Sequence, residues 1–138
     1  MKVALIAAGP LIAMFDTTDR VHAWYERLLA DADVQYRLYT TWPCLVEASH
    51  LLGSLALLKL LKWVGLGAVH IFPLDQTALL EMTQSMHSDT EPPRFEMDLA
   101  DASLSWGAAE TGVVSVLTVD VKDVSRYRLP DGRAFELL

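Results

Sequence analysis

The amino-acid sequence predicts an α/β fold, a three-layer sandwich in which a central, mostly parallel sheet of four to five strands lies between helices. Three observations predict it. Short apolar runs typical of buried strands alternate with longer segments in which apolar residues recur at helical spacing. The first run, Val3–Ile6, ends in two alanines, a glycine and a proline, an arrangement typical of a strand followed by a helix. With 138 residues, the chain is long enough for one domain, which we expect to span residues 1–138.

The expected strands are short and rich in apolar or β-branched residues. They cover Val3–Ala7, "QYRLYT" at 35–40, "AVHIF" at 68–72, "VVSVLTVD" at 113–120 and, as an edge strand, "AFELL" at 134–138. Because helices are expected between most successive strands, the crossovers should be right-handed and the strands parallel. The carboxyl ends of parallel strands meet along one edge of the sheet, where ligands bind in such folds.

The expected helices follow from apolar spacing and from residues that favour helix ends. They are a short helix from Pro10, then 17–32, 41–53, Ser54 to about Val64, 74–87, 97–112 and a turn at Val121–Val124. In the helix at 17–32, Thr18 or Asp19 is the expected N-cap. The segment "SDTEPPR" at 88–94 is expected to be a loop, because it is polar and contains two prolines.

The chain carries 18 acidic and 11 basic residues, a net charge of −7. This argues against a protein that binds nucleic acid through a basic face alone. It is compatible with an acidic pocket that meets phosphate through a bound cation. A basic cluster near the C-terminus comprises Lys122, Arg126, Arg128 and Arg133, and we expect it to be solvated surface.

A single cysteine, Cys44, cannot form an internal disulfide, and no leader sequence is evident, so a reducing cytoplasm is expected. Cys44 lies among apolar neighbours and should be a buried, unreactive thiol. The longest apolar stretch, at 51–69, is interrupted by glycines, a serine and two lysines. It therefore predicts a helix of a globular protein and no membrane span.

Four carboxylates fall near the predicted carboxyl edge of the sheet. Asp120 directly follows the fourth strand, and Glu47 lies in the helix after the second. Asp98 and Asp101 are three residues apart at the start of a helix, so they share one face of its first turn. A carboxylate cluster without histidine or thiolate neighbours is typical of a Mg²⁺ or Mn²⁺ site and suits zinc poorly. Such a site would activate water and bind a phosphate for in-line displacement.

Each acid also has an ordinary structural explanation. Asp98 is placed to cap its helix and, with Asp101, to complement the helix dipole. Asp120 is placed to cap the turn before Asp123. Glu47 is harder to explain in this way, because its helix face is otherwise apolar and burying an unpaired carboxylate is costly. Spacing alone leaves the metal site and the capping roles as open alternatives.

Taken in order, several segments resemble the PIN-domain ribonucleases, in particular the VapC-type toxins of bacterial toxin–antitoxin pairs. These segments are "LIAAGPLIAMFDTTDRVHAW" at 5–24, "TTWPCLVEASHLL" at 40–52, "DLADASL" at 98–104, "VLTVDVKDV" at 116–124 and "YRLPDGRAFELL" at 127–138. The resemblance implies a parallel sheet with a metal site at its carboxyl edge and RNA cleavage that depends on Mg²⁺ or Mn²⁺. It also implies a homodimer that a small antitoxin protein neutralises.

By this resemblance, Glu47, Asp101 and Asp120 correspond to the second, third and fourth acids of the family's site. Asp98 corresponds to an accessory acid, and Thr118 to a hydroxyl that supports the last carboxylate. In the parent enzyme, these acids and a carboxylate at position 7 would hold one or two divalent ions. A metal-activated water would then attack the phosphorus in line.

The first acid of the family should stand at the end of the first strand, where this chain has Ala7. Loss of a group that only supports a metal ligand costs ~10–100-fold in affinity or activity, and loss of a ligand should cost at least as much. We therefore expect a ribonuclease that is inactivated at position 7. An engineered replacement of aspartate by alanine and a naturally disabled copy are the two open explanations.

Two other classes of protein stay open. A non-catalytic PIN-like module would only sequester a protein partner, with the apolar helix pair at Leu45–Val64 as a dimer face or antitoxin groove. A phosphoacceptor receiver domain also gathers acids and Mg²⁺ at strand ends, but it needs paired acids after the first strand and a lysine after a late strand. Ala7 and Ala8 follow the first strand, and Lys122 lies in a helical turn, so this match is poor.

Overall fold

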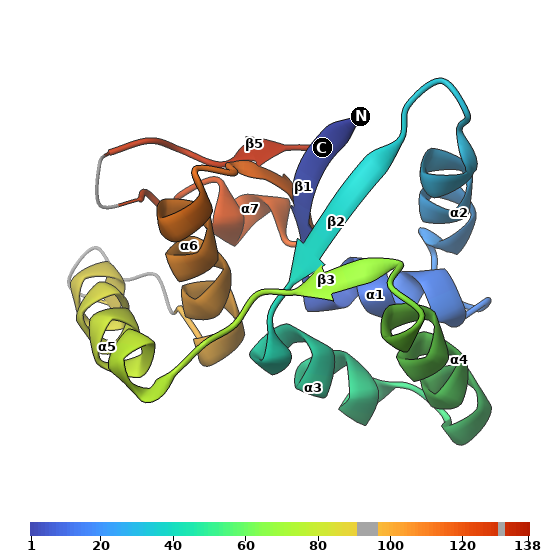
Figure 1. Cartoon of the computed structure of the whole chain (residues 1–138), viewed down its shortest axis with the longest axis horizontal. Coiled ribbons are helices and arrows are strands. Elements are labelled where there is room, and N and C mark those ends of the chain that lie inside the picture. The colour runs from blue at the N-terminus through green and yellow to red at the C-terminus, as the bar shows by residue number, and fades with distance from the viewer. Residues whose placement is uncertain (91–96, 130–131) are drawn as a thin grey trace.

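Figure 1 shows the computed structural model of the chain, which describes residues 1–90, 97–129 and 132–138. Its central sheet has five parallel strands in the order β3-β2-β1-β4-β5. They are β1 (Lys2–Ile6), β2 (Tyr36–Thr40), β3 (Val69–Ile71), β4 (Ser115–Leu117) and β5 (Glu136–Leu137). The predicted α/β sandwich with a parallel sheet is confirmed, including the edge strand near the C-terminus.

Strand β1 is the centre of the sheet. Ala4 pairs with Leu38 of β2, and Leu5 pairs with Val116 of β4. Successive side chains of a strand point to opposite faces, so Leu5 enters one hydrophobic core while Ala4 and Ile6 enter the other. Burial on both faces explains why this strand is a continuous apolar run and does not alternate with polar residues.

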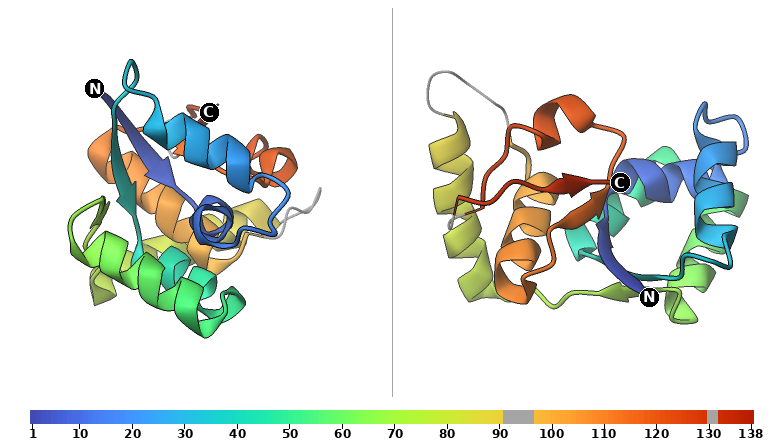
Figure 2. Two further views of the ribbon diagram at one scale, coloured as in Figure 1. Left: turned by 90° about the vertical axis from the view of Figure 1, so that its right-hand side faces the viewer. Right: turned by 90° about the horizontal axis from the view of Figure 1, so that it is seen from above.

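Helices cover both faces of the sheet (Figures 1 and 2). On one face lie α1 (Ala8–Phe15), α2 (His22–Ala30) and α4 (Ser54–Gly65), and on the other lie α5 (Gln76–Thr90) and α6 (Leu99–Thr111). Helix α3 (Trp42–Leu51) packs against both α1 and α6, and a short helix α7 (Val121–Val124) follows β4. In α3, Cys44 belongs to the core under α6, whereas Leu45 and Ala48 belong to the core under α1.

The apolar helix pair at Leu45–Val64 is divided between core and surface. Leu45, Leu60 and Val64 are buried, as expected of core residues. Four leucines of this region are exposed: Leu51, Leu55, Leu58 and Leu61. In the described ranges, none of the helices combines the length and the apolar character that crossing a bilayer requires.

Several helix boundaries differ from the sequence prediction. Helix α2 begins at His22, and neither Thr18 nor Asp19 is its N-cap. The Asp19 carboxylate instead accepts a hydrogen bond of 3.0 Å from the Val21 N–H, which closes a turn before the helix. Gly53 does not end α3. It is the N-cap of α4, and its carbonyl accepts the Leu57 N–H at 2.8 Å.

The other two differences are at α1 and α5. Helix α1 begins at Ala8, two residues before Pro10, and so keeps that proline in its first turn, where a missing N–H costs nothing. Helix α5 continues to Thr90, so residues 88–90 of the predicted loop at 88–94 are helical. The remaining loop residues, 91–94, lie outside the described part of the chain.

The strand order places the crevice of the fold beside β1. From β1 the chain proceeds to β2 and β3 on one side, then crosses to β4 and β5 on the other. In open parallel sheets, ligands bind outside the carboxyl ends of the strands at this reversal, which lies between β1 and β4. The receiver-domain alternative requires the order 2-1-3-4-5, so the observed topology excludes it.

Gly9, in the first turn of α1, lies so close to another segment of the chain that a side chain does not fit there. A Cβ added there would lie 2.3 Å from Cγ2 of Val119, in the segment that follows β4. This contact joins the start of α1 to the chain leading into α7. The glycine of "AAGP" is therefore required for packing of these two segments at the carboxyl edge.

Replacement of Gly9 by alanine should destabilise the protein, because Val119 or α1 must shift to admit the methyl group. The overpacking predicts a loss of roughly 1–3 kcal/mol in the free energy of unfolding, measured by urea denaturation. Gly65→Ala is the matched control, since no atom lies within 4 Å of its added Cβ. The steric explanation is wrong if Gly9→Ala is as stable as the parent. It is also wrong if adding Val119→Ala to Gly9→Ala does not restore the lost stability.

Candidate functional site

Four helices begin at the carboxyl edge of the sheet. Their N-cap residues are Ala7 for α1, Thr41 for α3, Asp98 for α6 and Asp120 for α7. Each helix start directs unpaired N–H groups and a partial positive charge towards this edge. The parallel topology thus gathers an environment that favours anionic groups, and the predicted acids lie within it.

Asp98 and Asp120 both act as helix caps. The Asp98 carboxylate accepts the Asp101 N–H at 2.8 Å, and the Asp120 carboxylate accepts the Asp123 N–H at 3.2 Å. Both capping roles considered from the sequence are therefore present. Each of these two capping bonds engages only Oδ1 of its carboxylate, so capping and cation binding are compatible for the same carboxylate.

Asp101 is the half-buried carboxylate of the group. Burial first, and then the negative charges of Asp98, Asp120 and Glu47, raise its pKa from 3.8 to about 7. The Tyr127 hydroxyl opposes this effect, because it donates a hydrogen bond of 3.1 Å to Oδ2 of Asp101. The structure therefore brings all four predicted acids into electrostatic contact, with Asp101 as their common neighbour.

Glu47 lies on α3 beside this group, and its pKa is raised by partial burial and by the charge of Asp98. The sequence analysis treated Glu47 as a candidate ligand because it expected this carboxylate to be buried, and that expectation is wrong. Glu47 is exposed, and so are Val46 and Leu51 of the same helix, because this part of α3 faces outward. What connects Glu47 to the site is its proximity to Asp98.

Buried hydroxyl groups form hydrogen bonds at the end of β2, at the start of α3 and in the first turns of α6. Thr40 Oγ1 donates to the carbonyl of Ile6 at 2.8 Å, and Thr41 Oγ1 lies 2.5 Å from Ser103 Oγ. Ser103 in turn donates to the carbonyl of Ala100 at 2.7 Å. These bonds satisfy side chains that are shielded from water and fix the starts of α3 and α6 relative to β1.

Thr118 and Cys44 lie close to the same edge. Thr118 is buried, and its hydroxyl accepts the Asp120 N–H at 3.1 Å, so it holds the backbone of the last acid. Cys44 is 1% exposed, and burial raises its thiol pKa to about 11. The predicted buried and unreactive thiol is confirmed, since a protonated thiol is a poor nucleophile.

Ala7 occupies the end of β1 at the centre of this edge. Its N–H donates to the carbonyl of Leu117 at 3.0 Å, and its backbone is extended, with φ −82° and ψ 174°. No side chain caps α1 at this point. An N-cap in extended conformation is a position that aspartate favours, so the backbone would accept the acid that the family resemblance places there.

The donor chemistry of the site fits a hard divalent cation. Four carboxylates supply oxygen ligands of the kind that Mg²⁺ and Mn²⁺ prefer. Burial and the charges of the other three acids raise the pKa of Asp101, and a bound cation would offset the repulsion between these charges. Within the described residues, however, no three of the acidic, histidine or cysteine side chains are close enough together to hold an ion as they stand.

Sequence reasoning missed several residues of the site. Tyr127 contacts Asp101 from 26 positions along the chain, and its neighbours Arg126 and Arg128 gave no sign of the hydrogen bond. The pairing of Thr41 with Ser103 was also missed, although hydroxyls after a buried strand and inside an otherwise apolar helix face are a usable signal. Trp42, at the start of α3, was treated only as part of a helix.

Comparison with known proteins identifies the fold. No protein-family profile and no curated protein matches the chain. Among solved structures, it is similar to VapC20 from Mycobacterium tuberculosis, a toxin that cleaves the sarcin–ricin loop. The TM-score is 0.71 with 17% identity, over 88% of this chain and 92% of that one. The chain is also similar to VapBC2 from Rickettsia felis, solved with promoter DNA, with a TM-score of 0.66 and 11% identity over 99% and 98%.

These similarities span almost the whole length of each chain. The protein therefore has the fold of VapC-type PIN domains, as the resemblance of its sequence segments predicted. Identities of 11–17% carry the architecture and not the chemistry. What this chain does has to be argued from its own site.

The metal-free protein should lose stability as the pH rises from about 4 to about 7. In this window the folded chain keeps a proton on Asp101 that the unfolded chain has lost. The free energy of unfolding should fall by at most about 1.4 kcal/mol per pH unit, and by less where solvent screens the carboxyl. Urea unfolding in EDTA across this range measures the slope.

Asp101→Asn should flatten this pH dependence. Asp33→Asn is the matched control, because it removes an exposed acid in the connection between α2 and β2. Persistence of the slope in Asp101→Asn would show that another group titrates.

Tyr127→Phe should raise the pKa of Asp101 beyond its present value. The variant keeps the buried ring and removes only the hydroxyl that stabilises the ionised carboxylate. Carbon-detected NMR titration of the aspartate carboxyls measures the shift. Tyr25→Phe is the control, since that hydroxyl donates to the carbonyl of Thr118 and not to an acid. An Asp101 titration unchanged by Tyr127→Phe would contradict the assigned hydrogen bond.

Proposed function

We propose that the protein is an endoribonuclease toxin of the VapC type that depends on Mg²⁺ or Mn²⁺ and is inactivated by Ala7. The observation that carries this proposal is the electrostatic coupling of Asp98, Asp120 and Glu47 to Asp101 at the carboxyl edge of a VapC-like fold. Like charges are costly to gather unless a cation is to be bound. The structurally similar VapC20 is a toxin that cleaves the sarcin–ricin loop, which supports this proposal.

Glu47, Asp101 and Asp120 are the proposed ligands, with Asp98 as an accessory acid. A divalent cation bound there would activate water and neutralise charge on the scissile phosphate. Tyr127 orients the Asp101 carboxylate through its hydrogen bond, and the buried contact of Thr41 with Ser103 fixes the helix starts that present the acids. Because no three of the described acidic side chains are close enough together to hold an ion as they stand, the acids have to move towards the cation when it binds.

RNA is the proposed substrate, and the negative charge of the chain is no obstacle, since a cation supplies the local positive field. Lys122 and Arg126 of the basic cluster are exposed just after Asp120, and Arg126 lies 3.9 Å from Asp123. We propose that these two side chains contact the phosphate backbone of the bound RNA. An RNA substrate also places the activity in the cytoplasm.

The proposed protein partners are a second copy of the chain and a small antitoxin. Their binding would cover the exposed leucines at the end of α3 and along α4. Leu51, Leu55 and Leu58 are 63–77% exposed, an unusual density of large apolar side chains in contact with water. The neighbouring VapBC2 structure was solved with promoter DNA, which fits a toxin–antitoxin pair.

The same apolar surface favours a second candidate function. A non-catalytic PIN-like module that sequesters a protein partner would need this surface and no acid at position 7. The two candidates differ in one respect: only the ribonuclease predicts that an added carboxylate at position 7 creates activity.

Ala7→Asp should create RNA cleavage that requires Mg²⁺ or Mn²⁺, at least ~10–100-fold above the rate of the Ala7 chain. Cleavage of several RNA substrates, with and without EDTA, measures it. Ala7→Asn is the matched control because it has the same shape without the charge. The double variant Ala7→Asp with Asp101→Asn should lose the gained activity.

If folded Ala7→Asp cleaves no tRNA, rRNA or mRNA substrate with either metal, the result would favour the non-catalytic binding module. Cleavage that survives EDTA or the loss of Asp101 would count against a metal site at this edge.

A further inference from the structure

A mostly apolar groove lies directly beside the acids. It has a volume of about 600 Å³, within the ~300–1,000 Å³ of small-ligand sites. Its apolar lining consists of Trp42, Pro43, Val46, Leu99 and Ala100, from the starts of α3 and α6. Figure 1 shows these two helix starts side by side at the carboxyl edge.

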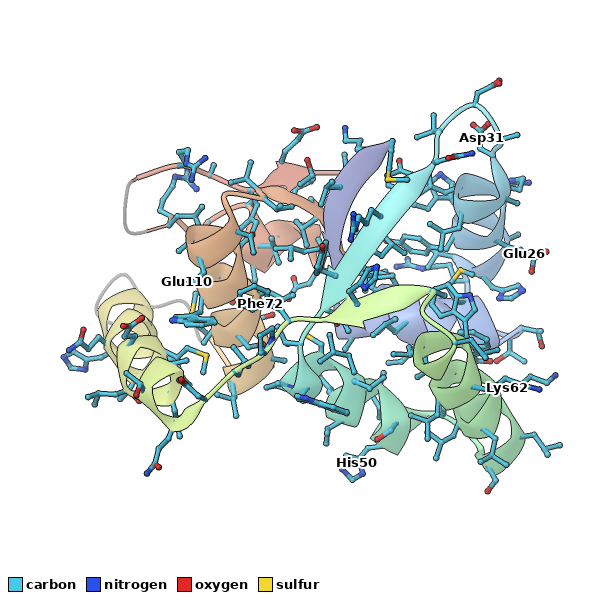
Figure 3. All side chains as sticks on the ribbon, viewed as in Figure 1. Glu26, Asp31, His50, Lys62, Phe72 and Glu110 are labelled. Carbon is cyan, nitrogen blue, oxygen red and sulfur yellow. The ribbon has the colours of Figure 1, made fainter. Side chains whose placement is uncertain are left out.

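The groove is continuous with the proposed metal site, because Glu47 and Asp98 belong to both. At its other end lies His50, which Figure 3 shows on the side of α3 turned away from the sheet. A ligand held at the acids would therefore reach into the groove without crossing another element. The groove and the acids form one extended binding surface.

The lining suits the neutral part of a nucleotide. Among the described residues that line it, none is a lysine or an arginine, and its two charged groups are both acids. Phosphate would be repelled by such a lining, whereas a flat, uncharged base would not. Trp42 is the first residue of α3 and is 54% exposed. An exposed indole ring is a surface on which an unpaired base can stack.

We propose that this groove binds an unpaired base of the RNA next to the scissile phosphate, with Trp42 as its stacking residue. The proposal rests on the proposed ribonuclease function and extends it, because it assigns a substrate subsite outside the acids. It makes Trp42 a positioning residue that holds the nucleotide while the acids hold the cation. Stacking on one aromatic ring is worth about 5- to 150-fold in affinity for single-stranded RNA.

The Ala7 chain itself is suited to the test, because the proposed function predicts that it binds RNA without cutting it. Fluorescence anisotropy in Mn²⁺ would compare a short labelled RNA with the same ribose-phosphate backbone lacking bases. Trp42→Ala should weaken binding of the intact RNA by about 5- to 150-fold and leave binding of the abasic backbone unchanged. Trp42→Phe should retain most of the affinity.

Trp24→Ala is the matched control. Trp24 is exposed to a similar degree, 45%, but lies on α2 and does not line the groove. It should leave both affinities unchanged. Because Trp42 is exposed, Trp42→Ala is expected to fold, and circular dichroism confirms this for each variant.

Three outcomes would overturn the base subsite. One is an equal loss of affinity for intact and abasic RNA in Trp42→Ala. Another is no difference between the two RNAs in the parent chain, whether both bind or neither does. The third is dissociation of a dimer in Trp42→Ala without any change in RNA binding, which would assign the groove to a second copy.

Failure of the subsite and failure of the proposed function are distinguishable. If Ala7→Asp cleaves RNA with metal while the parent chain does not distinguish intact from abasic RNA, only the subsite is wrong. If Ala7→Asp cleaves no RNA with either metal, the ribonuclease assignment itself is wrong.

Discussion

Repulsion between carboxylates at one edge of the sheet is the constraint on which the rest of the site depends. The parallel topology starts four helices at this edge, and acids from α3, α6 and α7 surround Asp101. The fold offsets this charge only in part. Helix starts, capping N–H groups and the Tyr127 hydroxyl each stabilise some negative charge. Asp101 nonetheless keeps a raised pKa, first because it is half-buried and then because the other acids repel its charged form.

The scaffold beneath these acids is built from backbone and hydroxyl groups. Thr40 ties β2 to Ile6, and the contact between Thr41 and Ser103 ties α3 to α6. Gly9 permits α1 to approach the segment after β4. None of these contacts uses a carboxylate. Neutral groups therefore fix these helix starts and strands relative to one another, whereas the acids are held by the caps and by Tyr127.

Much of the fold could be predicted from the sequence, because apolar runs and helical spacing report burial directly. The capping roles of Asp98 and Asp120 were also visible, since caps depend on neighbours three residues away. Side chains that meet across the fold were not. The orientation of Glu47 depends on how α3 packs against α6, and the partner of Tyr127 depends on the path after α7. Such contacts arise from tertiary packing, which no local pattern encodes.

Ala7 ends the central strand of the sheet, and the bonds that fix it come from its own backbone and from Leu117. A methyl group at the end of the central strand is therefore structurally harmless. The fold therefore tolerates a methyl group or a carboxylate at this position, so the charge at the end of the central strand can change without any rebuilding of the scaffold.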